Sequence, residues 1–394
     1  MLRKPARRHG SRLPLQVTLF LLGTMSFAVA EASSGRGDVL VHNRDDPRAE
    51  LIFACDRPTS ELPALFTPAL IADLQQIKAG IALSTEDLSP ERAEVVRRLN
   101  AAGIPMTAWI ALPRDQGYYV NAGNAPLTAA RIEEFDKWTI ANGLRWQAVG
   151  LDIEPTLAEY GTLMGHKGQL LYLMLRRAFD SARVRRARDA YAELIRSMQA
   201  RGYYVQTYQL EFIADERRVH TTILERLFGI VDVRGNQEVL MLYDSFNHAV
   251  GAGVLWQYGP EAQTVAVGST ATSGDAAADA KFPPLNWEEF SRDLIVARHF
   301  SKVVGVYSLE GCVRQGFIAR LKTMDWNQQV VIPGDSVRKA AGFRKFVFAV
   351  LWVGSHFLYF VVAFLLVTAW LVRLIVRRRR RKRAARMASV GVSA

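Results

Sequence analysis

The sequence predicts an α/β protein, a (β/α)8 TIM barrel with an N-terminal signal segment and one C-terminal transmembrane helix. Short apolar runs rich in β-branched residues alternate with longer helix-period segments through the body of the chain. Eight such runs fall in roughly 290 residues, which suits one closed barrel. Long uncharged stretches near both ends are flanked by basic residues. An open doubly wound sheet is the alternative, but the Gly-rich first turn that it normally carries is absent.

The first 30 residues have the layout of a secretory signal peptide. Five Lys or Arg precede eighteen uncharged residues, and small residues stand at Ala28 and Ala30. An uncleaved signal anchor is the alternative, because eighteen residues are just long enough to cross a bilayer. In either case the basic residues stay in the cytoplasm, and the chain that follows is expected outside it.

Residues 346–372 are predicted to form the transmembrane helix, because this run of 27 residues carries no charged side chain. A basic tail, residues 373–394, follows it and is expected in the cytoplasm. Residues 31–332 then form an extracytoplasmic barrel, and residues 333–345 a tether. The predicted location is the cytoplasmic (inner) membrane, crossed once by the C-terminal helix.

The net charge of +12 is concentrated in the two tails. Residues 1–30 and 341–394 together carry sixteen Lys or Arg and no acid, which leaves 34 basic against 38 acidic residues between them. We therefore expect no nucleic-acid partner, since a phosphate-binding protein carries its basic patch on the folded domain. The seven His are scattered, and neither Cys-x-x-Cys nor His-Glu-x-x-His occurs. We expect neither a metal site nor a cofactor.

The eight predicted strands cover residues 51–55, 77–84, 104–112, 147–153, 203–210, 238–243, 264–268 and 302–309. Predicted helices cover residues 90–102, 128–142, 168–201, 215–228 and 286–300. Residues 270–284, rich in Ala, Gly, Ser and Asp, predict a mobile loop after the seventh strand. In this fold the chemistry lies at the carboxyl ends of the strands, so the residues at which each run stops are the candidate site.

The fourth strand ends in two carboxylates, Asp152 and Glu154. Side chains two apart on a strand share a face, which puts these groups about 7 Å apart at their Cα atoms, with Gly150 on the same face. Two like charges this close favour the protonated state of one of them, as a general acid requires. A solvated strand end whose acids cap the next helix is the alternative.

The sixth strand ends Met241-Leu242-Tyr243-Asp244, and the eighth continues from Tyr307 through Ser308-Leu309-Glu310-Gly311. Together with Asp152-Ile153-Glu154, these residues resemble the corresponding strands of chitinase-like proteins, glycoside hydrolase family 18. The resemblance covers about residues 50–325. It implies a TIM barrel in which these motifs end the fourth, sixth and eighth strands, in the same order as in that family.

The resemblance implies that Glu154 is the proton donor and that Asp152 positions a substrate acetamido group, which itself attacks the anomeric carbon. It implies that Tyr243 hydrogen-bonds the acetamido oxygen and that Asp244 helps to hold the sugar. The sequence departs from the family at Gly150, where a second Asp is usual, and at Tyr307, where a Trp is usual. The first departure removes the group that normally shares a proton with Asp152.

Further rim residues complete the candidate site. Trp109 and Tyr208 are placed to stack on sugar faces, as are Trp256 and Tyr258, although a packing role suits each equally well. Glu310 is a further candidate substrate contact, whereas Asp56 and Glu211 are rim carboxylates without an assigned role.

The two cysteines are predicted to form a disulfide. Cys55 ends the first strand and Cys312 follows the eighth, and these strands are neighbours in a closed barrel. An oxidising compartment permits the bond, and two independent buried thiols are the alternative.

Two functions from different classes remain open at this point. The first is a membrane-tethered glycosidase that acts on an extracytoplasmic polysaccharide or oligosaccharide with N-acetylated amino sugars, by substrate-assisted general acid catalysis. The second is a non-catalytic carbohydrate-binding or scaffold barrel of a cell-envelope polysaccharide system, which the missing acid at Gly150 would suit.

Overall fold

A computed structural model describes residues 37–43, 47–156, 159, 172, 174, 176–246, 248–271 and 282–390 of the chain. The predicted signal segment, residues 1–30, lies outside the described residues, as does most of the predicted loop at 270–284.

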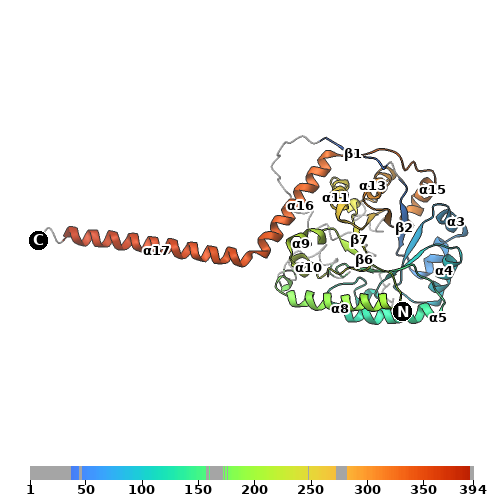
Figure 1. The fold of residues 1–394 in the computed structure, drawn as a ribbon, viewed down its shortest axis with the longest axis horizontal. Coiled ribbons are helices and arrows are strands. Elements are labelled where there is room, and N and C mark those ends of the chain that lie inside the picture. The colour runs from blue at the N-terminus through green and yellow to red at the C-terminus, as the bar shows by residue number, and fades with distance from the viewer. Residues whose placement is uncertain are drawn as a thin grey trace, which may run out of the picture.

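Eight parallel strands close into a barrel, which confirms the predicted (β/α)8 architecture (Figure 1). The strands are β2 (Glu50–Cys55), β3 (Gly80–Ser84), β4 (Met106–Ile110), β5 (Ala148–Asp152), β6 (Val205–Leu210), β7 (Gln237–Met241), β8 (Thr264–Gly268) and β9 (Val303–Tyr307). Each strand pairs with the next, and β2 also pairs with β9 in the register Ile52↔Gly305. The barrel is therefore closed, and an open sheet is excluded.

The strands form because their residues fit a surface that is buried on both sides. Every residue of β3, β4, β5 and β8 is buried, since side chains fill the barrel inside and helices cover it outside. This explains why the strands appear in the sequence as continuous apolar runs.

Helices follow most of the strands and surround the barrel. They are α2 (Leu62–Leu65), α3 (Pro68–Gln76), α4 (Pro90–Ala101), α5 (Ala125–Ala141), α8 (Ser181–Ala200), α9 (Ile213–Val219), α10 (Ile223–Phe228), α11 (Gly251–Tyr258), α13 (Trp287–Phe300), α14 (Leu309–Arg314) and α15 (Phe317–Lys322). Capping side chains fix the first residues of two of these helices. The Ser89 side chain accepts from Arg92 N at the start of α4, and Asn286 and Glu289 form a capping box at the start of α13.

A second, two-stranded sheet was not predicted from the sequence. Strand β1 (Val39–Val41) pairs antiparallel with β10 (Val330–Ile332), with Val39 opposite Ile332. Each strand has only three residues, too few for a period-2 pattern to stand out. The sheet joins the segment before the barrel to the segment after it.

The structure differs from the expected tether at residues 333–345. Helix α16 (Gly334–Ser355) begins there and packs against α11 and α9, with Ala340, Val347 and Leu351 buried. Small and apolar residues at helical spacing give this segment a face that packs on the barrel, so it is a docked helix instead of a loose linker.

Helix α17 (Phe357–Val390) follows a break at His356 and extends away from the barrel (Figure 1). Its segment Phe357–Arg379 has 23 residues and is long and apolar enough to cross a membrane, by length and composition. The predicted span began at residue 346. The first ten residues of that span instead belong to α16, two of whose side chains there, Val347 and Leu351, are buried.

Candidate active site

The carboxylates Asp152 and Glu154 lie at the carboxyl end of β5, where the loop after β4 returns beside them. Val120 N donates to Asp152 O at 2.9 Å, and Glu154 N donates to Val120 O at 3.0 Å. These two bonds continue the parallel pairing past the end of the strand and fix the backbone on both sides of the acids. Both acids are buried, with exposed fractions of 4% and 1%. We call these two residues the acidic pair.

Among the described residues, the charged groups that shift the pKa of Asp152 are both acids. The pKa of Asp152 is raised well above its ordinary value, first by burial, then by the negative charge of Glu154 and a hydrogen bond with Glu154, and also by the charge of Asp56. Asp152 Oδ1 has no hydrogen-bond partner among the described residues. One carboxyl group of the pair therefore keeps a proton when ordinary carboxyl groups have lost theirs.

Three tyrosines surround the acidic pair. The rings of Tyr243 and Tyr307 stack with centroids 5.9 Å apart. Burial raises the pKa of both hydroxyls, and Glu154 raises it further in each case. Tyr119, in the loop that returns beside β5, is also buried, and the charges of Glu154 and Asp152 raise its pKa. The site is thus lined by neutral hydroxyl groups.

Tyr119 was not predicted from the sequence as a site residue. A signal was present, because Gly117 at φ 109° turns the chain immediately before a pair of aromatic residues at 118–119 in a βα loop. Tyr118 itself is buried, and its hydroxyl lies 3.1 Å from Ser84 Oγ and donates to Asp56.

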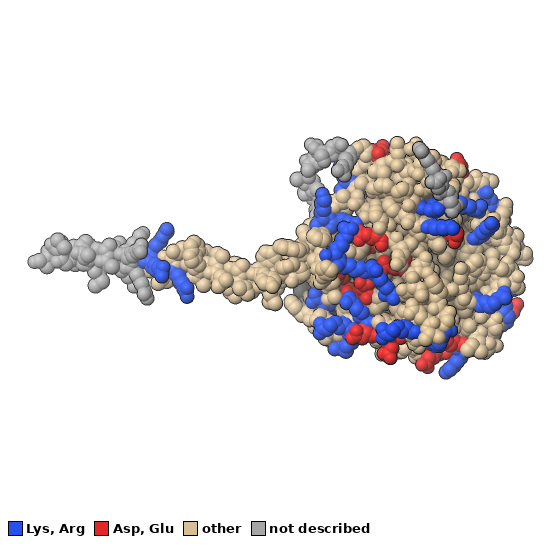
Figure 2. Space-filling model, viewed as in Figure 1, with Lys and Arg blue, Asp and Glu red and all other residues tan. Residues whose placement is uncertain are grey.

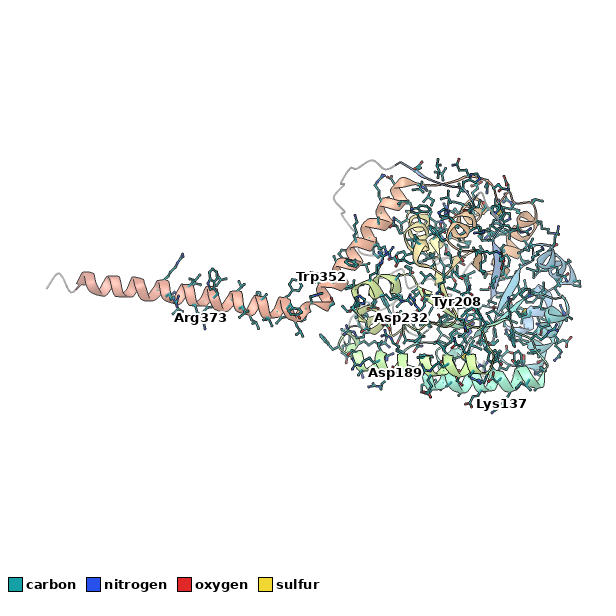
Figure 3. All side chains as sticks on the ribbon, in the orientation of Figure 1. Lys137, Asp189, Tyr208, Asp232, Trp352 and Arg373 are labelled. Atoms are coloured by element: carbon teal, nitrogen blue, oxygen red, sulfur yellow. The ribbon has the colours of Figure 1, made fainter. Side chains whose placement is uncertain are left out.

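Tyr208, labelled in Figure 3, lies on β6 and fills the space next to Gly150 on the neighbouring strand β5. A Cβ atom at Gly150 would lie 2.8 Å from Tyr208 Cε2, closer than real Cβ contacts. The Tyr208 hydroxyl donates to Gln206 Oε1 at 3.3 Å on the same strand. The aromatic ring thus occupies the position from which a second Asp would reach Asp152.

Two other predicted residues lie at the same end of the barrel. Trp109 is buried, and its ring meets that of Tyr118 edge-on at 6.3 Å. Its Nε1 has no hydrogen-bond partner among the described residues. Glu310, in α14, acts electrostatically on Tyr307, and burial raises its pKa to about 7. Glu310 forms no ion pair within the described part of the chain, and its Oε2 has no hydrogen-bond partner there.

Asp244, the predicted sugar contact next to Tyr243, forms an ion pair with an arginine of α13. Arg292 Nη2, from α13, lies 2.5 Å from Asp244 Oδ2 and 2.7 Å from Asp293 Oδ1. Burial and the charge of Asp293 raise the pKa of Asp244, and Arg292 opposes that increase. Asp244 therefore helps to attach α13 to the barrel.

The predicted disulfide is wrong. Cys55 and Cys312 are both buried free thiols, although β2 and β9 are neighbours as predicted. Cys312 lies in the helix that follows β9, and its thiol donates to Thr270 Oγ1 at 3.5 Å. Adjacent strands bring the two cysteines to one end of the barrel, but the Cys312 side chain is directed to the end of β8.

The described residues contain no group of three or more His, Cys, Asp or Glu side chains arranged to hold a metal ion. Strand β8 ends at Gly268 without a carboxylate, so the described barrel offers no nucleophile from that strand.

No protein-family model matches this chain, and neither does any curated protein. Among solved structures, the chain is similar to the glycoside hydrolase domain of PgaB (BpsB) from Bordetella bronchiseptica, at 10% identity and a TM-score of 0.42 over 70% of this chain and 98% of that one. A D-psicose 3-epimerase is similar at 13% identity and a TM-score of 0.36, over 76% and 99% of the two chains. Gas2p from Saccharomyces cerevisiae, in complex with laminaritetraose and laminaripentaose, is similar at 12% identity and a TM-score of 0.32, over 69% and 60%. These likenesses are too distant to assign a reaction.

Proposed function

We propose that this protein is a membrane-tethered glycoside hydrolase that acts on an extracytoplasmic polysaccharide containing N-acetylated amino sugars. The observation that supports the proposal is the acidic pair, two carboxyl groups buried beside each other at the carboxyl end of the barrel and faced by tyrosine hydroxyls. The glycosidic oxygen leaves readily only when it receives a proton as the bond breaks. A carboxyl group that keeps its proton near neutral pH can donate that proton.

In the proposed reaction the substrate supplies its own nucleophile. The acetamido oxygen attacks the anomeric carbon, the glycosidic C–O bond breaks, and Glu154 gives its proton to the leaving oxygen. Water then opens the cyclic intermediate and returns a proton to Glu154. Asp152 orients the acetamido N–H, the Tyr243 hydroxyl donates to the acetamido oxygen, and the Tyr307 ring lies beneath the sugar.

A second candidate function is a non-catalytic barrel that binds the same kind of polysaccharide. Two observations favour it. Tyr208 occupies the space beside Gly150, so Asp152 lacks the acid with which it would exchange a proton. The acidic pair is also at least 96% buried, so a sugar reaches it only if the surrounding side chains move.

Turnover of N-acetylhexosamine oligomers by the full chain in a neutral detergent separates these functions. We expect the wild type to release shorter oligomers, detected by mass spectrometry, and Glu154→Gln to lose activity by about 100-fold or more, the usual contribution of a general acid. Glu211→Gln is the matched control. Glu211 is another buried carboxylate at this end of the barrel and has no role in the proposed reaction, so Glu211→Gln should keep the activity of the wild type.

Oligomer binding without cleavage by wild type and Glu154→Gln alike would support the non-catalytic barrel and exclude the hydrolase. Protease access tests the proposed membrane orientation. We expect the barrel to be digested only from the extracytoplasmic side, while the Arg-rich tail after the span is protected there.

A further inference from the structure

Asp56 is a carboxylate at the carboxyl end of the barrel to which the proposed reaction gives no role. It follows the last residue of β2, and its side chain is partly buried. The negative charge of Asp56 contributes to the raised pKa of Asp152, although Asp56 is not a member of the acidic pair. Asp56 therefore acts on the acidic pair from the end of another strand.

The Asp56 side chain accepts a hydrogen bond from the Tyr118 hydroxyl. The same hydroxyl lies 3.1 Å from Ser84 Oγ, and the Tyr118 side chain is buried. Burial, the charge of Asp56 and the hydrogen bond to Asp56 all raise the pKa of Tyr118. The phenol therefore keeps its proton, and remains a donor to Asp56, throughout the range in which carboxyl groups titrate.

Tyr118 lies in a part of the loop with an uncommon backbone conformation. Gly117 has φ 109° and Tyr118 has φ 66°, so two consecutive residues are in the left-handed region. A bulky residue keeps this conformation only where its surroundings hold it. The bond to Asp56 helps to hold Tyr118 here, together with the backbone bond from Leu112 N to Tyr118 O at 2.9 Å.

The same loop brings Tyr119 to the acidic pair. The rings of Tyr118 and Tyr119 meet edge-on, with their centroids 4.8 Å apart. The next residue, Val120, forms backbone hydrogen bonds with both members of the acidic pair. Asp56, Tyr118 and Tyr119 thus form a continuous series of contacts that ends at the two acids.

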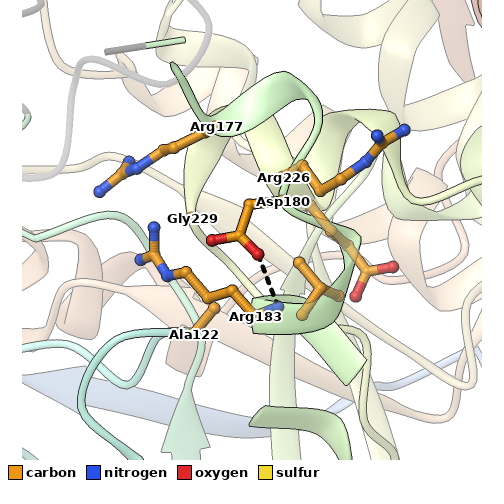
Figure 4. Close-up of a pocket in the computed structure, with 8 residues that line it drawn as sticks. Ala122, Arg177, Asp180, Arg183, Arg226 and Gly229 are labelled. Carbon is orange, nitrogen blue, oxygen red and sulfur yellow. Dashed lines mark hydrogen bonds between the residues drawn. The ribbon is translucent and has the colours of Figure 1, made fainter. Parts of the chain in front are cut away.

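The far half of this loop is held by other contacts. Ala122 N donates to Gly229 O at 2.7 Å, and both residues are labelled in Figure 4. The Tyr191 hydroxyl, on α8, donates to Asn121 O at 3.0 Å. These bonds attach residues 121–122 to the surrounding helices. Loss of the Tyr118–Asp56 bond should therefore loosen residues 117–120 and leave residues 121–122 in place.

Acids on the surface of the barrel have cations beside them, as the mixture of basic and acidic side chains in Figure 2 shows. For Asp56 this cation is Arg114, whose Nη2 lies 4.0 Å from Asp56 Oδ2. Arg114 Nε lies closer to Glu86 Oε1, at 3.0 Å, and the Arg114 side chain is 46% exposed. Because Arg114 is shared with Glu86 and in contact with water, it does not cancel the effect of Asp56 on the acidic pair.

Tyrosines are the other titratable groups that face the acidic pair. Burial and the charge of at least one acid of the pair raise the pKa values of Tyr119, Tyr208, Tyr243 and Tyr307. These hydroxyls are neutral while carboxyl groups titrate. The other charged or titratable groups that interact electrostatically around Asp56 are Cys55, Arg57, Arg92 and Glu310. Among the described residues, Asp56 is thus the charged group outside the pair that shifts the pKa of Asp152.

We propose that Asp56 is a positioning residue for the acidic pair. Through the Tyr118 hydroxyl it holds residues 117–119 in place, so that Tyr119 faces the acids, and its negative charge opposes loss of the proton that the pair retains. The inference rests on the proposed hydrolase for its catalytic meaning, in which Asp56 would extend the activity to higher pH. Its tests measure protonation and local structure, which do not depend on turnover.

Asp56→Asn tests the charge, because the amide oxygen can still accept from Tyr118. In carboxyl carbon-13 NMR of the full chain in a neutral detergent, we expect the acidic pair to lose its retained proton at a lower pH than in the wild type. Glu86→Gln is the matched control and should titrate as the wild type does, since Glu86 also contacts Arg114 but does not shift the pKa of Asp152. An unchanged titration in Asp56→Asn, or an equal shift in the control, would overturn the proposal.

Tyr118→Phe tests the anchor, because it keeps the charge of Asp56 and removes the hydrogen bond. We expect the Val120 amide to exchange its hydrogen about tenfold faster or more, the effect of losing one bond to a charged group. The Ala122 amide, which donates to Gly229, is the internal control and should keep its rate. Wild-type exchange of the Val120 amide in Tyr118→Phe would overturn the anchoring role.

The pH dependence of turnover connects these results to the proposed function. If the wild type cleaves oligomers, the loss of activity at high pH should begin at a lower pH in Asp56→Asn. A wild type that cleaves none would refute the hydrolase, whereas the titration and exchange experiments would still decide the role of Asp56.

Discussion

The joint between α16 and the barrel buries acids beside arginine, whereas the carboxyl end of the barrel buries acids beside one another. At the joint, Arg344 Nε lies 2.7 Å from Asp215 Oδ1, a second guanidinium nitrogen contacts Glu261, and the guanidinium lies 4.2 Å from the Tyr258 ring centre. At the barrel end, the charged neighbours among the described residues that shift the pKa of Asp152 are Glu154 and Asp56. Buried acids are thus neutralised by a cation in one region and by a proton in the other.

This difference distinguishes acids that hold two structural elements together from acids that can transfer a proton. A buried ion pair holds two elements together but leaves neither group free to react. A buried carboxyl group beside other acids makes folding less favourable at neutral pH, and its altered protonation suits it to proton transfer. The following predictions test each half of the comparison.

Removing the cation at the joint should have the largest effect. Arg344→Ala leaves Asp215, which is 1% exposed, without its counterion, and breaking a buried pair in this way costs about 3 kcal/mol or more. Denaturant unfolding of the full chain measures the loss, and hydrogen exchange should show α16 losing protection first. Arg97→Ala, whose ion pair with Glu94 is exposed, should cost less than about 1 kcal/mol. Equal losses in both variants would contradict a structural role for Arg344.

Neutralising an acid at the barrel end should instead stabilise the protein. Burial raises the pKa of Glu211 from 4.5 to about 7, so the folded state holds a proton that the unfolded state releases. The contribution of this carboxyl group to the free energy of unfolding is fully present below pH 4.5 and is lost as the pH rises through about 7. Glu211→Gln removes that loss, a gain of up to ~3 kcal/mol above pH 7. The gain should vanish below about pH 4, where the unfolded glutamate is itself protonated. A stability difference that does not change with pH would contradict the burial argument.

Restoring an acid at Gly150 should depend on Tyr208. Gly150→Asp alone places a Cβ atom 2.8 Å from the Tyr208 ring and should destabilise the protein by about 1 to 3 kcal/mol. Tyr208→Ala makes room, so the double variant should lose less than the sum of the single losses, with a coupling of about 1 kcal/mol. Chemical unfolding of all four proteins gives this coupling. If the stability losses of the two single variants simply add in the double variant, the Tyr208 ring does not occupy the site of the missing acid.

The smallest predicted effect concerns the cysteines. Titration of the denatured, unreduced protein should find two reactive thiols, since Cys55 and Cys312 are free in the structure. The folded protein should react slowly because both thiols are buried. Two unreactive cysteines after denaturation would restore the disulfide predicted from the sequence.

Much of the fold could be predicted from the sequence because buried parallel strands leave a strong pattern. The eight apolar runs became β2 to β9, and the strand ends located Asp152 and Glu154 correctly at the carboxyl end of the barrel. The two short strands at Val39 and Val330 left no periodic signal, and the docking face of α16 could not be distinguished from a linker before its partners were known.

Side-chain direction was the part that the sequence could not supply. Asp244 follows its strand as the resemblance implied, yet it turns to Arg292 on α13, a residue 48 positions later in the chain. Tyr119 reaches the acidic pair because a loop returns beside β5, and Cys312 turns to Thr270 instead of Cys55. Each case depends on a contact between distant segments, which strand order alone does not determine.

The protonation of the acidic pair tests the central claim most directly. Carbon-13 NMR of the carboxyl groups, assigned with Asp152→Asn and Glu154→Gln, would follow the pair between about pH 3 and 9, a range that spans ordinary carboxyl titration. We predict that the pair keeps one proton at a pH where ordinary carboxyl groups are ionised, and that either substitution changes the titration of the other group. Two independent carboxyl groups, both ionised by about pH 5, would contradict the proposed acid.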